Sequence, residues 1–173
     1  RQVMSTIGKK ILSLLNNPNR RKRSGTSLVP FEKASSIGVL YTWTDSKKEE
    51  VLASLVQQIG LNKKVEILCF NPSNTPIPTE YPSFDRTALT HFGKLNAEVV
   101  QHFVQFPFDY LFHFDLESDE IVKSILVQTK AKCRIGIHDE FNTAYYELMI
   151  GINKSAGITN FADQMIKYVS SIR

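Results

Sequence analysis

The sequence has few cysteines and no long apolar run, and these two shortages argue against a disulfide-bonded protein and a membrane-spanning protein. Its two cysteines, Cys69 and Cys133, each lie in an apolar strand-like run, so we expect two buried thiols rather than a disulfide. No apolar run approaches the roughly 20 residues that span a membrane, and a secretory signal peptide is not evident. The sequence therefore predicts a cytoplasmic protein, with a peripheral position at the inner membrane as the alternative.

Sequence motifs of common enzymes are also missing. Neither G-x-G-x-x-G nor G-x-x-x-x-G-K occurs, and both motifs need glycines so that the backbone can approach a phosphate. There is no G-x-S-x-G nucleophile elbow, no H-x-x-x-H pair and no close cysteine pair that would suggest zinc. The sequence therefore predicts no catalytic residue, no metal ligand, no cofactor and no small-molecule substrate.

The first 23 residues contain no acidic residue but seven basic ones. These are Arg1, Lys9, Lys10, Arg20, Arg21, Lys22 and Arg23. The rest of the chain has 14 basic and 17 acidic residues, so a basic arm precedes a mildly acidic body. This arm, rather than the fold, is the expected contact for a polyanion.

Residues 3–15 also have the periodicity of an amphipathic helix. Their apolar residues recur at spacings of three and four, which places most of them on one helical face. The apolar face expected to contact a partner consists of Val3, Met4, Ile7, Ile11, Leu14 and Leu15. The residues that follow are rich in Asn, Pro, Gly and Ser, which indicates a helix stop and a linker. We therefore expect a basic amphipathic helix and linker over residues 1–34 and a folded domain over residues 35–173.

Strand-like and helix-like segments alternate from residue 35 onward. Strands are expected at 35–43, 63–70, 108–116, 132–137 and 145–150, and helices at 46–60, 96–106, 118–130 and 158–172. The segment 71–95 contains several prolines and is expected to be a surface loop. Two β-α-β units predict an α/β fold, a three-layer Rossmann-like domain with a mainly parallel sheet.

Ligands of such sheets bind beyond the carboxyl ends of the strands, so three turns are candidate sites. The first holds Thr42, Thr44 and Ser46, the second spans residues 115–119, and the third spans residues 138–140. A site would form only if the strands before these turns were adjacent. We interpret all three as ordinary capped or solvated turns.

The turn that holds Thr42, Thr44 and Ser46 shows why we expect no ligand at these turns. Ser46 and Glu49 have the spacing of a capping box, which would begin the helix expected at 46–60. Residues 47–50 have the sequence Lys-Lys-Glu-Glu, a charge pattern typical of a solvated first helical turn. Helix capping therefore explains this turn without a ligand.

Residues 108–137, FDYLFHFDLESDEIVKSILVQTKAKCRIGI, resemble part of the ADP-heptose-type glycosyltransferases, in which an aspartate-containing strand, a helix and an A-K-x-R-I-G strand follow one another. Most of residues 35–172 resembles an uncharacterised single-domain family of Bacteroidota, which shares the basic N-terminal segment, the SIGVL strand, the F-G-K loop at 92–94 and the AKCRIG run. The resemblance implies a fold like the acceptor-side half of a two-domain glycosyltransferase. The donor half and the glycine-rich opening turn with its catalytic acid are missing, so it also implies a scaffold without sugar transfer.

Together these observations predict a non-enzymatic binding or adaptor protein. Its basic N-terminal arm would dock on a large anionic assembly, with RNA or the ribosome as the leading partner. The first alternative is a peripheral component of a membrane-associated complex, docked by the amphipathic helix. The second alternative is a small-ligand-binding or glycosyltransferase-like enzyme.

Overall fold

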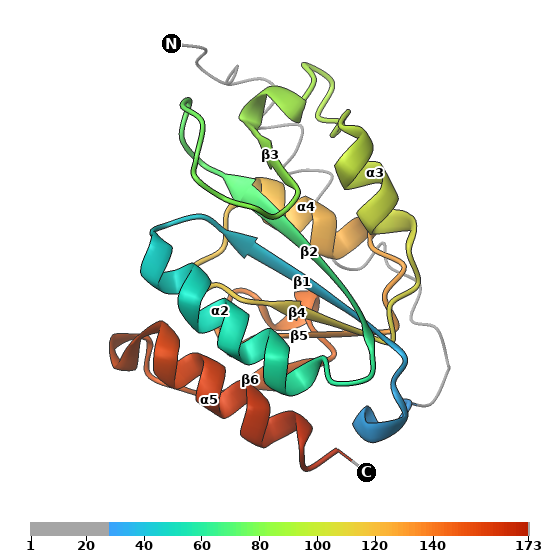
Figure 1. Cartoon of the computed structure of the whole chain (residues 1–173). Helices are drawn as coiled ribbons and strands as arrows, with labels where there is room; N and C mark the ends of the chain where they lie inside the picture. The colour runs from blue at the N-terminus through green and yellow to red at the C-terminus, as the bar shows by residue number, and fades with distance from the viewer. Residues whose placement is uncertain (1–27, 173) are drawn as a thin grey trace.

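The computed structural model describes residues 28–172, which form three layers around a six-stranded sheet (Figure 1). The strands are β1 (Ser36–Thr42), β2 (Lys64–Asn71), β3 (Ser83–Asp85), β4 (Tyr110–His113), β5 (Cys133–Ile137) and β6 (Leu148–Ile150). Their order across the sheet is β3-β2-β1-β4-β5-β6, and every pair is parallel. The predicted Rossmann-like α/β fold is confirmed. The helix predicted near the N-terminus lies outside the described residues.

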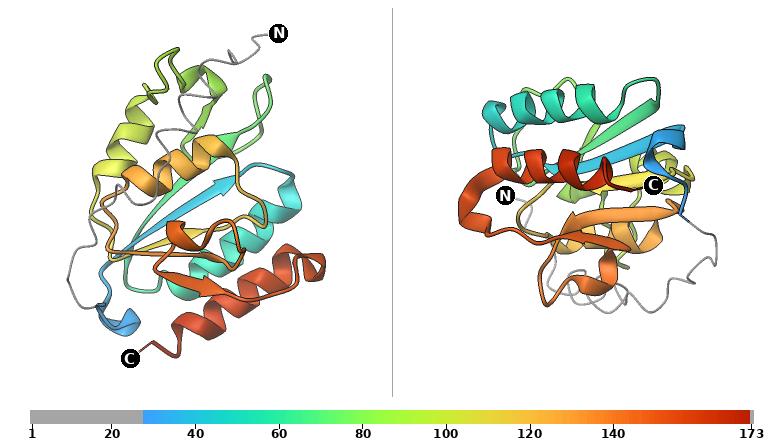
Figure 2. Two further views of the ribbon diagram at one scale, coloured as in Figure 1. Left: turned by 180° about the vertical axis from the view of Figure 1, so that it is seen from behind. Right: turned by 90° about the horizontal axis from the view of Figure 1, so that it is seen from below.

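Two helices cover each face of the sheet (Figure 2). On one face lie α2 (Ser46–Ile59) and α5 (Gly157–Val169), and on the other lie α3 (Glu98–Gln105) and α4 (Glu120–Gln128). The short 3-10 helices are η2 (Phe31–Lys33), η3 (Arg86–Ala88), η4 (Thr143–Tyr145) and η5 (Lys154–Ala156). Within residues 28–172, no helix is long and apolar enough to cross a membrane.

Each face of the sheet has its own apolar core. Leu52 of α2 and Phe161 of α5 pack on the face that also holds the two buried cysteines, which form no disulfide. Phe103 of α3 and Ile125 of α4 pack on the opposite face. β1 is buried over its first six residues because a central parallel strand is covered on both sides, which explains its continuous apolar sequence.

The predicted start of α2 was wrong in one detail. The N-cap is Asp45, whose carboxylate accepts a hydrogen bond from the Lys48 N–H at 2.8 Å, so Ser46 is already the first helical residue. Glu49 does not reach back to close a capping box. Its carboxylate instead accepts hydrogen bonds from the hydroxyls of Tyr41 and Thr79.

The predicted loop at 71–95 contains a short strand that sequence periodicity did not reveal. β3 has three residues and pairs with the end of β2 at the edge of the sheet. It follows Pro82 directly, and the Pro82 carbonyl accepts a hydrogen bond from the Cys69 N–H at 2.9 Å. A proline is tolerated there because only its carbonyl, and not its missing N–H, takes part in the pairing with β2.

The described chain joins the sheet at the amino ends of its strands. The Tyr110 hydroxyl donates a hydrogen bond to the Val29 carbonyl. The Ser35 N–H donates to the Asp109 carboxylate at 2.8 Å, and Lys132 forms an ion pair with the same carboxylate at 2.8 Å. Residues 29–35 are therefore attached to β4 and to the start of β5, at the end of the sheet opposite the carboxyl termini of the strands.

Candidate functional site

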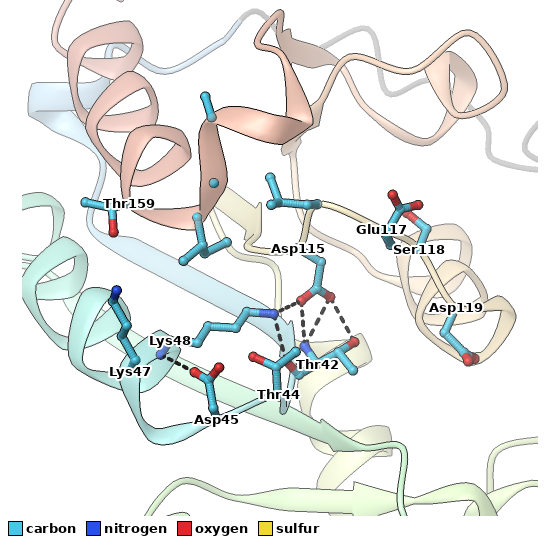
Figure 3. A pocket seen from close by; sticks show the side chains of 14 residues that line it. Thr42, Thr44, Asp45, Lys47, Lys48, Asp115, Glu117, Ser118, Asp119 and Thr159 are labelled. Carbon is cyan, nitrogen blue, oxygen red and sulfur yellow. Dashed lines mark hydrogen bonds and ion pairs between the residues drawn. The ribbon is translucent and has the colours of Figure 1, made fainter.

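A crevice opens between the carboxyl ends of β1 and β4. These strands are neighbours in the middle of the sheet, but the chain leaves β1 for α2 on one face and leaves β4 for α4 on the other. In open α/β sheets, ligands bind where the strand order reverses in this way. A cavity of about 630 Å³ lies at this position, lined by residues of 42–48, 115–119 and 156–159 (Figure 3).

Asp115 is the hub of the hydrogen bonds beneath this cavity. Its side chain is only 3% exposed. One carboxylate oxygen lies 2.5 Å from Lys48 Nζ and accepts the Thr42 N–H at 2.8 Å. The other accepts the Thr42 hydroxyl at 2.9 Å and lies 2.8 Å from His113 Nε2. Figure 3 shows Lys48 reaching across the crevice to this carboxylate.

His113 extends the network into the core. It is completely buried, and its Nδ1 lies 2.6 Å from the Tyr146 hydroxyl. Because the Asp115 carboxylate can only accept, the proton of a neutral imidazole belongs on Nε2, and the Tyr146 hydroxyl then donates to Nδ1. Gly136 makes room for this tyrosine, since a Cβ at that position would lie 2.2 Å from Tyr146 Cε1.

The surroundings of these groups fix their protonation. Burial by itself would raise the pKa of Asp115, but the hydrogen bond from His113 and the charge of Lys48 outweigh it and hold the pKa below its usual range. Burial raises the pKa of Tyr146 well above its usual value. Asp115 therefore stays ionised and Tyr146 stays protonated near neutral pH, which suits a structural network better than proton transfer.

Lys48 was wrongly predicted to belong to a solvated first turn. It is 6% exposed, and its ammonium group also donates to the Thr42 carbonyl at 2.8 Å. The neighbouring Lys47 is exposed and lines the cavity, as a surface residue would. Lys48 is buried because it lies on the side of α2 that packs on the sheet, where Asp115 compensates its charge.

The three candidate turns converge only in part. The turns after β1 and β4 line the cavity, but the turn after β5, residues 138–140, does not. Asp139 of that turn instead accepts a hydrogen bond from Lys154 at 3.0 Å, and Lys154 also lies 3.3 Å from the Glu117 carboxylate. Lys154 thus links the loops that follow β4 and β5.

The third wall of the cavity is the start of α5, which sequence reasoning missed. Ala156, Gly157, Ile158 and Thr159 line the cavity there. Gly157 has a φ of 86°, a left-handed conformation that favours glycine, and this glycine in front of an amphipathic segment was the available signal. No sequence pattern indicated that this helix would begin beside the turn that follows β1.

Other carboxylates around the cavity also have defined structural partners. Asp45 caps α2, and Asp119 caps α4 by accepting the Ile121 N–H at 2.8 Å. Asp119 also forms an ion pair with Arg86 at 2.8 Å. Among residues 28–172, no group of three His, Cys, Asp or Glu side chains could hold a metal ion. The groups available to a ligand in the cavity are hydroxyls, backbone groups and the exposed charges of Lys47 and Glu117.

The contact residues predicted for the N-terminal arm, basic and apolar alike, all lie between residues 1 and 23 and therefore outside the described residues. They stay a prediction.

The strand order, the two helical layers and the crevice define the chain as a Rossmann-like α/β protein. A family model described as "Family of unknown function (DUF6913)" matches residues 5–172, and the chain belongs to that family. No curated protein and no solved structure matches the chain. The expected membership of an uncharacterised family is confirmed.

Proposed function

We propose that this protein is a non-enzymatic binding or adaptor protein that docks through its basic N-terminal arm, residues 1–23, on a large anionic assembly. RNA, in particular that of the ribosome, is the partner that this chemistry favours. The observation that carries the proposal is the separation of charge. The arm has seven basic residues and no acidic one, whereas residues 28–172 have 13 basic and 17 acidic residues. Phosphate contacts by such an arm would bind with little sequence selectivity and strong salt dependence.

The ion pairs of the body, residues 28–172, support the assignment of polyanion binding to the arm. Seven of its 13 basic side chains form ion pairs with acidic side chains, namely Lys48, Lys64, Arg86, Lys123, Lys132, Arg134 and Lys154. A cation that already has a carboxylate partner adds little to the attraction of a polyanion. The arm therefore differs from the body in that none of its seven basic residues has an acidic residue near it in the sequence.

The described chain begins at the end of the sheet opposite the cavity. Val29 is held at the amino ends of the strands by Tyr110, whereas the cavity lies at their carboxyl ends. A cytoplasmic location accords with an RNA partner.

The engagement of the Asp115 carboxylate favours binding over catalysis. A general base needs a carboxylate that can take a proton, and the donors around Asp115 keep its pKa low. We further propose that the body is a scaffold related to the acceptor-side half of ADP-heptose-type glycosyltransferases, and that the family belongs to Bacteroidota. The pattern of residues 108–137 carries this relationship.

The test is sedimentation of tagged protein with ribosomes from lysate at low and high salt. The quadruple variant R20A/R21A/K22A/R23A should lose sedimentation that high salt also removes from the unmodified chain. The matched control is K47A/K94A/K130A/K167A, which removes the same charge from exposed lysines that form no ion pair within the described body. Equal sedimentation of the arm variant and the unmodified chain would overturn the proposal.

The same fractionation separates the membrane alternative. Protein that stays on membranes at high salt, and is released by the changes Ile7→Asp, Ile11→Asp and Leu14→Asp, would be docked by the apolar helix face. That outcome would replace the RNA proposal with the membrane one.

A second candidate function, binding of a small ligand, is favoured by the 630 Å³ cavity at the crevice. Hydroxyl groups of Thr42, Thr44 and Thr159 would contact a polar ligand there. A ligand at about 100 times its Kd should stabilise the protein by roughly 2.7 kcal/mol. Thermal unfolding in the presence of a metabolite panel tests this, with Thr44→Trp, which fills the cavity, as the variant that should lose the effect.

A further inference from the structure

β2 is paired unequally on its two sides. β1 pairs with it from Lys64 to Phe70, but β3 pairs only with its last three residues, Cys69–Asn71. The first part of β2 therefore forms an open edge of the sheet (Figure 1).

The hydrogen bonds at the two ends of β2 show which groups face this open edge. The Lys64 N–H donates to the Ser35 carbonyl on the β1 side, and the Cys69 N–H donates to the Pro82 carbonyl on the outer side. Because successive residues of a strand direct their N–H and C=O groups to alternate sides, those of Val65 and Ile67 face outward. No strand of residues 28–172 pairs with them there. The edge thus offers two donors and two acceptors.

An apolar groove lies along the same edge. It has a volume of about 400 Å³, with Val99 and Phe103 of α3 on one side and Tyr81 and Pro82 on the other. The side chains of Val65 and Ile67 are partly buried within it. Unpaired backbone beside apolar side chains is the combination that binds an extended peptide as an additional strand.

The Glu66 carboxylate lies in the middle of this edge. Glu66, 21% exposed, points to the α3 side, where its carboxylate lies 3.4 Å from His102 Nε2 and 3.3 Å from Lys64 Nζ. A second copy of the chain could pair antiparallel with this edge, so that the backbone N–H and C=O groups of Val65 and Ile67 in each copy form hydrogen bonds with those of the other. In that arrangement the two Glu66 side chains would lie directly opposite each other. Like charges directly opposite are destabilising, so this edge disfavours self-pairing.

We propose that the open edge of β2 is a docking site for an extended peptide segment of a partner protein. The segment carries a lysine or arginine opposite Glu66 and apolar residues on either side of it, opposite Val65 and Ile67. The backbone of β2 provides the attachment, and Glu66 selects the charge of the partner. This surface shares no lining residue with the crevice between β1 and β4.

The experiment uses the full chain and labelled peptides of the sequence S-T-V-K-V-T-S and S-T-V-E-V-T-S. Fluorescence anisotropy should show the lysine peptide binding more tightly, by roughly fivefold, and Glu66→Lys should reverse the preference. A lysine peptide N-methylated at both valines lacks the donors that face the edge and should not bind. Equal binding of the methylated peptide, or an unchanged preference in Glu66→Lys, would overturn the proposal.

Amide hydrogen exchange tests the same site without relying on a variant. The amides of Val65 and Ile67 should exchange with solvent faster than those of Glu66 and Leu68, which face β1. The lysine peptide should slow exchange at Val65 and Ile67. The proposal would be overturned if the lysine peptide left the exchange rates of the Val65 and Ile67 amides unchanged. It would also be overturned if the protein self-associated through this edge.

Discussion

Lys48 Nζ and Asp115 Oδ1 lie 2.5 Å apart, although 67 residues separate them in the chain. Their side chains are only 7% and 3% exposed. The pair joins the first turn of α2 to the end of β4, which are the two sides of the crevice. It therefore holds together the point at which the sheet divides its helices between two layers.

Removal of this lysine should be costly. Lys48→Met keeps the apolar stem but leaves the buried Asp115 carboxylate without its cation, so we expect a loss of roughly 3–5 kcal/mol in the free energy of unfolding. Urea denaturation measures this loss. Lys47→Met is the control, because the neighbouring side chain is exposed, and it should change the free energy by less than about 0.5 kcal/mol. Similar losses in the two variants would contradict a stabilising role of the pair.

A methyl group at Gly136 should disturb the other end of the same network. Gly136→Ala places its Cβ 2.2 Å from the Tyr146 ring, which must move away from His113. Overpacking of this kind costs about 1–3 kcal/mol, measurable by thermal unfolding. Gly151→Ala is the matched control, since a Cβ there meets no atom within 4 Å. If both alanine variants unfold alike, Tyr146 is not confined as described.

Acid should weaken the attachment of residues 29–35 to the sheet. Burial alone would raise the pKa of Asp109, but hydrogen bonds from Lys132 and Ser35 hold it below the usual value. A carboxyl with a lowered folded-state pKa contributes stability that is complete above the unfolded pKa of about 3.9 and lost as pH falls through the folded one. We expect Asp109→Asn to flatten the loss of stability below about pH 4.

Urea midpoints between neutral pH and pH 3 measure this dependence. Asp163→Asn, on the exposed side of α5, controls for the loss of one negative charge. An acid profile of Asp109→Asn that matches that of the unmodified protein would show that this carboxylate is not linked to folding.

Cys69 should report on opening of the central sheet. Burial raises the pKa of its thiol to about 11, so little thiolate is present at pH 8 in the folded protein. In a Cys133→Ala variant, alkylation of Cys69 by iodoacetamide should be slow in buffer and fast in urea, as followed by mass spectrometry. Rapid alkylation in buffer would mean that β2 opens readily.

Long periodic segments made most of the fold predictable, and short or non-local features escaped. The apolar stripe of α2 and the continuous apolar run of β1 each indicated the correct element. β3 has three residues, too few for periodicity. Lys48 has the charge of a surface residue, and only its partner Asp115, distant in sequence, explains its burial.

The candidate site was predictable to the same degree. Parallel strands place the turns after β1 and β4 at one end of the sheet, as expected. Their adjacency depends on a strand order that the sequence does not specify, and this order also brings α5 beside them. The N-terminal arm, where the sequence signal for function is strongest, lies outside the described residues.

The position of Ala156–Thr159 in the wall of the cavity has a consequence for synthesis of the protein. A chain emerges from the ribosome from its N-terminus, and N-terminal parts fold first. The cavity is incomplete until α5 has been translated. Any molecule that occupies the cavity would therefore meet only chains in which α5 is already in place.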